Sequence, residues 1–364
     1  MNVPSLRHIV CAGLALLGML TACAQPAAVP AAPTPLPLAT ELVFYNWPED
    51  MPRSVLEAFT AEYGVAIKYQ EYASMEAAVA GLLAGQVYDV VNLDNRFIPA
   101  LIQAGRLAEL DHARLPNLKY IAPSFRDLVY DPGNRYAVPY NWGTTGLVIH
   151  HGYLDQPVTR WADLWDPRLN GQVALWLNEP REVLGLTLKA LGYSANSEEP
   201  AQLEAALARL VALKPHAHWL DSDIDSLAAA LEAGDVALGM GYAGDVLQAR
   251  AAQVAVDYVL PEEGALLWGE NFVIPASSSR RATAEVFLNY LLRPEVAAQV
   301  ANENYYATPN EAARPFIESD LLADPVVFPP NNLLRRAEIV LPLSAEGQAL
   351  YDRTWAAFLE APAP

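Results

Sequence analysis

Two hydrophobic periodicities alternate along the chain from Glu41 onward. The segments ELVFYNW, VAIKYQEY and YDVVNLD are short, apolar and rich in β-branched or aromatic residues, which predicts strands. Between them, PRSVLEAFTAEYG and MEAAVAGLLAG place apolar residues three and four positions apart. These segments end in Gly64 and Gly85, which predicts two helices, each terminated by a glycine. The alternation predicts an α/β fold with a parallel sheet covered by helices.

The same alternation continues through the rest of the chain. GLVIHHG, GQVALWLN and VALGM have the pattern of strands, and REVLGLTLKALG has the pattern of a helix. A third block begins with NFVIP and continues as TAEVFLNYLLRPEVAAQVANEN. No period of about 20–50 residues recurs, which excludes a solenoid.

Acidic and aromatic side chains recur directly after the predicted strands. In open α/β sheets, ligands bind outside the carboxyl ends of the strands. An aromatic ring beside a carboxylate suits an ammonium group, because the ring face attracts the cation and the carboxylate neutralises it. The segments in these positions are Trp47 to Asp50, Asp94 to Arg96, Asn178 to Glu182, Tyr242 to Asp245, and Trp268 to Glu270.

The segment GMGYAGDV contains a G-x-G-x-x-G pattern between a predicted strand and a predicted helix, and Glu262 and Glu263 follow near the spacing of a ribose-binding acid. A dinucleotide site needs bare backbone amides facing a pyrophosphate. Asp245 instead places a carboxylate in the first turn of the helix, where it repels a phosphate. We therefore expect the glycines to form a tight turn. Asp245 then either caps the helix or, with Tyr242, faces a cationic ligand.

Other candidate sites have simpler explanations. With Pro180 as the first helical residue, Glu179 and Glu182 match a helix capping arrangement that needs no ligand. His216 and His218 could share a metal, but no third ligand is evident. Nucleophile-elbow, zinc-protease and P-loop motifs are absent from the sequence. Paired carboxylates of the glycosidase kind leave a hydrolase as a minor alternative.

The N-terminus has the pattern of an export signal. Arg7 and His8 precede an apolar run that is too short to span a bilayer, and the run ends in Leu-Thr-Ala-Cys at Cys23. This ending resembles a bacterial lipobox, which implies cleavage after residue 22 and lipid attachment to Cys23. Residues 23–40 are rich in Ala and Pro and predict an extended tether. We therefore expect a periplasmic or cell-surface lipoprotein.

Composition narrows the function further. The chain has 364 residues, 53% of them hydrophobic, so it can bury the cores of two domains. Its 42 acidic residues outnumber the 23 basic ones, which disfavours nucleic acid as a partner. Cys11 and Cys23 are the two cysteines, and both lie in the predicted signal region. Thiol catalysis and cysteine-ligated zinc are therefore excluded from the folded part.

Several segments resemble the spermidine/putrescine-binding proteins of bacterial ABC importers. They run in order from about Leu42 to about Phe358 and include YNWPEDMPRSVLEAFTAEYGV, YAVPYNWGTTGLVIH, RWADLWDPRLNGQV, REVLGLTLKALGYS, AEVFLNYLLRPEVAAQV and YATPNEAAR. The resemblance implies a two-lobed periplasmic-binding-protein fold with a ligand cleft between the lobes. It implies one lobe from residues 41–142 and 268–310 and a second from 143–267 and 311–360. The chain would then cross between lobes near Trp142, near Leu267 and past Asn310.

The resemblance also implies a polyamine site. The matching positions are Trp47, Glu179, Glu182, Tyr242, Asp245, Trp268, Glu270 and Tyr306, and we add Asp94, which follows a predicted strand, to the expected site. The family implies no enzyme activity, cofactor or metal, and its partners are a polyamine and the permease subunits of the importer. The expected protein is a monomer that meets the membrane through its lipid alone.

Departures from the family pattern leave the ligand open. Pro48 and Asp50 replace a hydroxyl residue and a tyrosine, Asp94 replaces a serine, and Arg96 lies near a usual aromatic residue. An arginine in the cleft repels one end of a diamine unless an acid pairs with it. Two interpretations of Arg96 stay open: a ligand with an anionic end, or an outward-facing surface arginine. The same fold binding an amino-acid-like amine, ferric iron or an oxyanion is the principal alternative function.

Overall fold

In the computed structural model, residues 37–151, 154, 157–221 and 226–362 are described, and every structural statement concerns these residues. The predicted signal segment, Cys23 and the tether as far as residue 36 lie outside them. None of the described helices combines the length and the apolar character that a membrane-spanning segment needs.

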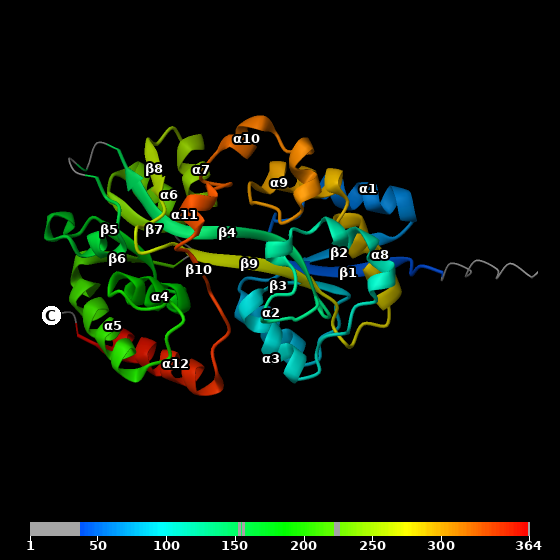
Figure 1. The fold of residues 1–364 in the computed structure, drawn as a ribbon, viewed down its shortest axis with the longest axis horizontal. Helices are drawn as coiled ribbons and strands as arrows, with labels where there is room; N and C mark the ends of the chain where they lie inside the picture. The colour runs from blue at the N-terminus through cyan, green and yellow to red at the C-terminus, as the bar shows by residue number, and fades with distance from the viewer. Residues whose placement is uncertain (1–36, 152–153, 155–156, 222–225, 363–364) are drawn as a thin grey trace, which may run out of the picture. The chain divides into compact units, whose positions relative to one another are not determined.

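Strands and helices alternate through much of the described chain (Figure 1). The strands are β1 (Glu41–Asn46), β2 (Ala66–Glu71), β3 (Val90–Asp94), β4 (Ala137–His150), β5 (Val173–Trp176), β6 (Ala217–Leu220), β7 (Leu238–Tyr242), β8 (Val256–Val259), β9 (Leu266–Val273) and β10 (Glu338–Ile339). The helices are α1 (Arg53–Tyr63), α2 (Met75–Leu83), α3 (Ile98–Gln103), α4 (Pro180–Ala190), α5 (Pro200–Leu213), α6 (Leu227–Ala233), α7 (Ala243–Ala251), α8 (Arg281–Leu291), α9 (Pro294–Asn304), α10 (Ser319–Ala323), α11 (Asn331–Leu334) and α12 (Ala345–Glu360). The α/β class is confirmed.

The two glycine helix ends predicted from the sequence are confirmed. Gly64 follows α1 with φ +69°, and Gly85 lies just past α2 with φ +83°. Residues that carry a side chain rarely adopt this left-handed backbone conformation, whereas glycine does so at no steric cost. Each glycine therefore ends its helix and lets the chain turn toward the next strand.

The sheet is mixed rather than wholly parallel. Strands β1, β2 and β3 pair in parallel, and so do β5, β6 and β7, as the alternation of strand and helix predicts. However, β4 and β9 pair antiparallel with each other, β9 with β3, and β4 with β7. The strand order is β2-β1-β3-β9-β4-β7-β5-β6. The prediction of a parallel sheet was thus correct for the two outer groups and wrong for the two strands between them.

The apolar side chains form separate cores at the two ends of this sheet. Near β1 to β3, alternate residues face opposite sides, so that Phe44 joins a core under α1, α8 and α9 and Tyr45 packs against a core under α2 and α3. The largest cluster lies near β5 to β8 and contains Trp161, Leu184 and Leu238, all fully buried. Two parallel groups, each covered on its faces, therefore have hydrophobic cores of their own.

Strands β4 and β9 connect these cores (Figure 1). In β4, Val138 belongs to the core near β1 while Leu147 belongs to the core near β7; β9 runs back from Leu266 to Phe272. Strands β4 and β9 are thus the two strands that contribute residues to both cores. The lobe boundaries that the family resemblance implies stay a prediction.

Candidate functional site

Trp47 and Glu270 meet at the edge of the core near β1. The indole Nε1 of Trp47, directly after β1, donates a 2.7 Å hydrogen bond to Oε1 of Glu270. The amide of Asn92 donates to the other oxygen, Oε2, at 2.8 Å. Burial raises the pKa of Glu270 to about 8, and the neighbouring carboxylate of Asp50 acts in the same direction. Glu270 is thus a partly buried acid whose ionised form a nearby cation would stabilise.

Asp50 is a second acid at this end, and it was noted in the sequence without being assigned to the site. Its carboxylate accepts hydrogen bonds from the amides of Asn46 at 2.8 Å and Asn304 at 3.3 Å. Burial raises the pKa of Asp50 to about 6. Because Asn304 belongs to α9, more than 250 positions later, no local sequence pattern indicates this contact.

Glu182 is the principal acid of the other lobe. It lies in the first turn of α4 with a relative exposure of 6%. Its Oε2 accepts a 2.6 Å hydrogen bond from the Thr145 hydroxyl and a 3.2 Å bond from the Tyr242 hydroxyl. Burial raises the pKa of Glu182 above its usual value, although these two hydrogen bonds partly oppose the rise. Thr145, in β4, was not singled out by the sequence, although its alternation with Gly143 on one face of the strand was a usable signal.

The helix-capping explanation for Glu179 and Glu182 fails. Glu179 does hold the N-cap position of α4 with Pro180 next, as the sequence predicts. Its side chain, however, accepts no capping hydrogen bond, and the Glu182 carboxylate bonds to Thr145 and Tyr242 instead. Both carboxylates are therefore available for a role other than closing the helix.

The G-x-G-x-x-G segment does not form a nucleotide loop. Gly239 and Gly241 lie inside β7, and α7 begins immediately after Tyr242. A Cβ on either glycine would lie 2.7 Å from a methyl of Leu227, so these residues are glycine to let α6 pack on the strand. Neither has positive φ. The expectation that the glycines serve to make a turn was wrong, because close packing is their function.

Asp245 caps the start of α7. Its Oδ2 accepts a 2.7 Å hydrogen bond from the backbone N–H of Tyr242, as the capping explanation requires. Burial nevertheless raises the pKa of Asp245 to about 6. A carboxylate therefore occupies the position in which a dinucleotide would place its pyrophosphate, and the two negative charges would repel each other.

Aromatic rings connect the two groups of acids. The rings of Trp268 and Tyr306 lie 5.2 Å apart in an edge-to-face arrangement, and Tyr242 lies 6.3 Å from Trp268. A Cβ on Gly143 would lie 2.3 Å from the Trp268 ring, so only glycine leaves room for that ring. The negative charges of Asp245 on one side and Glu270 on the other both act to raise the pKa of Tyr306, together with its burial.

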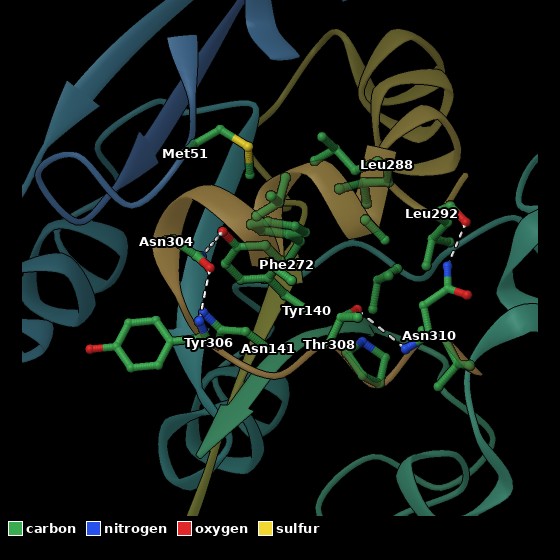
Figure 2. A pocket seen from close by; sticks show the side chains of 17 residues that line it. Met51, Tyr140, Asn141, Phe272, Leu288, Leu292, Asn304, Tyr306, Thr308 and Asn310 are labelled. Carbon is green, nitrogen blue, oxygen red and sulfur yellow. Dashed lines mark hydrogen bonds between the residues drawn. The ribbon is translucent and has the colours of Figure 1, made fainter. Parts of the chain in front are cut away.

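Tyr306 also borders an apolar pocket inside the lobe that contains β1. Figure 2 shows its phenol ring directed away from this pocket, while Met51, Leu288 and Phe272 lie around the interior. The backbone N–H of Tyr306 donates to Asn304 Oδ1 at 3.1 Å, which fixes the backbone just after α9. A Cβ on Gly244 would lie 3.0 Å from the Tyr306 hydroxyl, so the ring reaches the first turn of α7.

The structure corrects the positions of Trp268 and Glu270. The sequence placed them past the end of a strand, whereas they lie within β9, opposite Gly143 and Asn141 of β4. In the antiparallel register of β9 and β3, Glu270 also lies opposite Asp94, the last residue of β3. Trp268 and Glu270 line an open groove along β4 and β9, and Tyr306 lines the pocket of Figure 2. The other predicted positions line neither hollow, but charge and hydrogen bonds link Trp47 to Glu270 and Tyr242 to Glu182.

Arg96 is not an outward-facing surface residue. Its side chain is 17% exposed, and its Nε lies 3.8 Å from Oδ1 of Asp94. Burial raises the pKa of Asp94 above its usual value, although the positive charge of Arg96 partly opposes the rise. Burial also raises the pKa of Glu179 to about 8, with the charge of Arg96 acting in the opposite direction. The guanidinium therefore belongs to the acidic region between the lobes.

The described residues offer no metal centre. No group of three His, Cys, Asp or Glu side chains among them has the arrangement of metal ligands. His216 instead bonds through Nδ1 to the side chain of Asn170, and His218 through Nε2 to the carbonyl of Gly171. The arrangement that the described residues do offer is an acidic region lined by aromatic rings, which suits an organic cation.

The comparisons with known proteins agree with this chemistry. A family model described as bacterial extracellular solute-binding protein matches residues 54–328. The chain is 34% identical over 335 residues to the spermidine/putrescine-binding periplasmic protein of Escherichia coli, which covers 91% of this chain and 92% of that protein. It is 30% identical over 333 residues to the putrescine-binding periplasmic protein SpuD of Pseudomonas aeruginosa, covering 85% and 89%.

Solved structures resemble the fold over most of the chain. A putative spermidine/putrescine ABC transporter protein of Listeria monocytogenes superimposes with a TM-score of 0.80 at 30% identity, covering 88% of this chain and 99% of that one. The spermidine/putrescine ABC transporter substrate-binding protein of Streptococcus pneumoniae gives 0.78 at 29% identity, with the same coverages. The two-lobed α/β fold that the sequence resemblance implied is confirmed.

Proposed function

The chain belongs to the bacterial extracellular solute-binding proteins, and among them to the spermidine/putrescine-binding family of ABC importers, and on this premise we propose that it captures a polyamine and delivers it to an importer. Its relatives are periplasmic proteins, which supports an extracytoplasmic location. The sequence at Cys23 supports a lipid anchor, so that the Ala/Pro-rich tether would link the folded domain to the membrane.

The observation that carries this proposal is the pair of acids, Glu182 and Glu270, at opposite ends of the row of rings formed by Tyr242, Trp268 and Tyr306. Glu270 belongs to the end near Trp47, and Glu182 belongs to the end near Tyr242. A linear polyamine has ammonium groups for both acids and methylene groups for the rings between them. Each ring contributes about 0.5–2 kcal/mol to the binding of a nearby cation, depending on how far water is excluded. The nine positions predicted from the sequence are the site that we propose.

Closure of the lobes follows from the same geometry. Because β4 and β9 connect the two cores, rotation about them brings Glu182 and Glu270 toward a ligand from opposite sides. Excluding water from the region between the lobes strengthens the attraction between ammonium and carboxylate, since the effective dielectric constant falls. The proposed closed, liganded form is what the permease subunits would receive.

Calorimetric titration of the purified protein tests this function. We expect saturable binding of putrescine or spermidine, and no comparable binding of ferric iron or an oxyanion such as sulfate. Assays of glycoside hydrolysis on the same preparation address the carboxylate-pair hydrolase alternative. Absence of binding by every polyamine, or turnover of a glycoside, would overturn the proposal.

A further inference from the structure

Arg96 is a cation in an acidic region, and its guanidinium carbon lies 4.9 Å from the centroid of the Phe97 ring. Its Nε is buried and makes no hydrogen bond, and no described residue accepts a hydrogen bond from the rest of the guanidinium. The ion pair with Asp94, at 3.8 Å, is longer than a hydrogen bond. The backbone N–H of Arg96 donates to the same carboxylate at 2.8 Å, which fixes the residue at the end of β3.

The acids around Arg96 come from both lobes. Asp94 belongs to its own lobe, whereas Glu179 and Glu182 come from the start of α4 and are close enough for the charge of Arg96 to influence them. Among the described residues, none donates a hydrogen bond to the Glu179 carboxylate. Arg181, the other nearby cation, is directed elsewhere, because its guanidinium donates to Ala195 O and Asn196 Oδ1. Arg96 is therefore the cation that occupies this end of the site.

We propose that Arg96 stands in for one ammonium group of a polyamine, so that the site prefers linear diamines to triamines. The inference rests on the proposed function and narrows its ligand class. One ammonium group of a diamine is neutralised at Glu270, and the other at Glu179 and Glu182. A third ammonium group at the Arg96 end would meet a fixed positive charge instead of an unpaired acid.

The position of Arg96 also decides against a ligand with a carboxylate. A carboxylate that approached the guanidinium would lie among three other carboxyl groups, those of Asp94, Glu179 and Glu182. Like charges in a region shielded from water repel strongly. The interpretation of Arg96 as a receptor for an anionic ligand end is therefore disfavoured, and the guanidinium acts as a counter-charge for the protein's own acids.

The test compares putrescine, spermidine and γ-aminobutyrate by calorimetric titration of the wild-type protein and the variants Arg96→Gln, Arg96→Met and Arg96→Lys. We expect the wild type to bind putrescine about tenfold or more tightly than spermidine, which corresponds to the loss of one favourable charge interaction. Both neutral variants should lose this preference, and Arg96→Lys should retain it. Arg106→Gln is the matched control, because Arg106 is exposed after α3 and makes backbone hydrogen bonds alone.

The outcomes separate the two proposals. An unchanged ratio of putrescine to spermidine affinity in folded Arg96→Gln or Arg96→Met would overturn the role of Arg96 and leave the polyamine function intact. Tightest binding of γ-aminobutyrate by the wild type would also overturn it. If neither the wild type nor any Arg96 variant binds an amine, the proposed function fails and this inference fails with it. Thermal unfolding of each variant verifies that it is folded, and the two neutral replacements differ in polarity, so that misfolding of one leaves the other as the test.

Discussion

Replacing Glu182 with glutamine should lower the affinity for putrescine by about two orders of magnitude. The carboxylate is buried, and it bonds to Thr145 and Tyr242, so an ammonium group beside it forms a charge pair shielded from water. Truncating one member of such a pair costs about 2–5 kcal/mol. Glutamine keeps the size of the side chain and a carbonyl oxygen for Thr145, so the change falls mainly on the charge. Calorimetric titration measures the dissociation constant.

Two further variants show whether this effect is local. Glu57→Gln removes the same charge from an exposed position on α1 and should leave the affinity unchanged. Asp245→Asn should weaken binding less than Glu182→Gln, because Asp245 already accepts the backbone N–H of Tyr242. Equal affinities in the wild type, Glu182→Gln and Asp245→Asn would exclude the proposed site.

The second large effect is a rise in polyamine affinity between pH 6 and pH 8. Burial raises the pKa of both Glu179 and Glu270 to about 8, so at pH 6 these carboxyls are protonated before the ligand binds. An ammonium group favours the ionised form, and binding must therefore release protons. Each released proton raises the affinity by up to about tenfold per pH unit over this range. Titrations in two buffers with different heats of ionisation count the protons directly.

Stability without ligand should change in the opposite direction. A carboxyl whose pKa is higher in the folded protein than in the unfolded chain binds its proton more tightly when folded. Its contribution to stability is therefore present at low pH and is lost as pH rises from about 4.5 toward 8. The unliganded protein should have a lower melting temperature at pH 8 than at pH 5.5, and Glu270→Gln should reduce the difference. A polyamine affinity that does not change with pH, together with no proton release on binding, would contradict the raised pKa values of Glu179 and Glu270.

The candidate residues whose positions in the fold the sequence predicted correctly lie at the ends of parallel strands. Trp47 follows β1, Asp94 ends β3, Glu179 precedes α4 and Tyr242 ends β7. These positions follow from hydrophobic periodicity together with the rule that ligands bind at carboxyl strand ends. Local pattern is sufficient here, because each strand and the loop after it are continuous in sequence.

The parts that the sequence missed depend on contacts between distant segments. Trp268 and Glu270 lie within β9, whose antiparallel pairing with β3 and β4 has no signal in its own eight residues. Gly239 and Gly241 are explained by the packing of Leu227 from another helix. Arginine is usually a surface residue, and only the approach of α4 adds Glu179 and Glu182 to Asp94 beside Arg96. Each of these features requires tertiary structure rather than local propensity.

A crystal structure of the protein with bound putrescine tests the central claim most directly. The account predicts one ammonium nitrogen within hydrogen-bond distance, about 3 Å, of the Glu270 carboxylate and the other near Glu182 or Glu179. The four methylene groups should lie against Trp268 and Tyr306, with the guanidinium of Arg96 beyond the second nitrogen. A diamine bound elsewhere, or one whose nitrogens contact none of these carboxylates, would contradict the account.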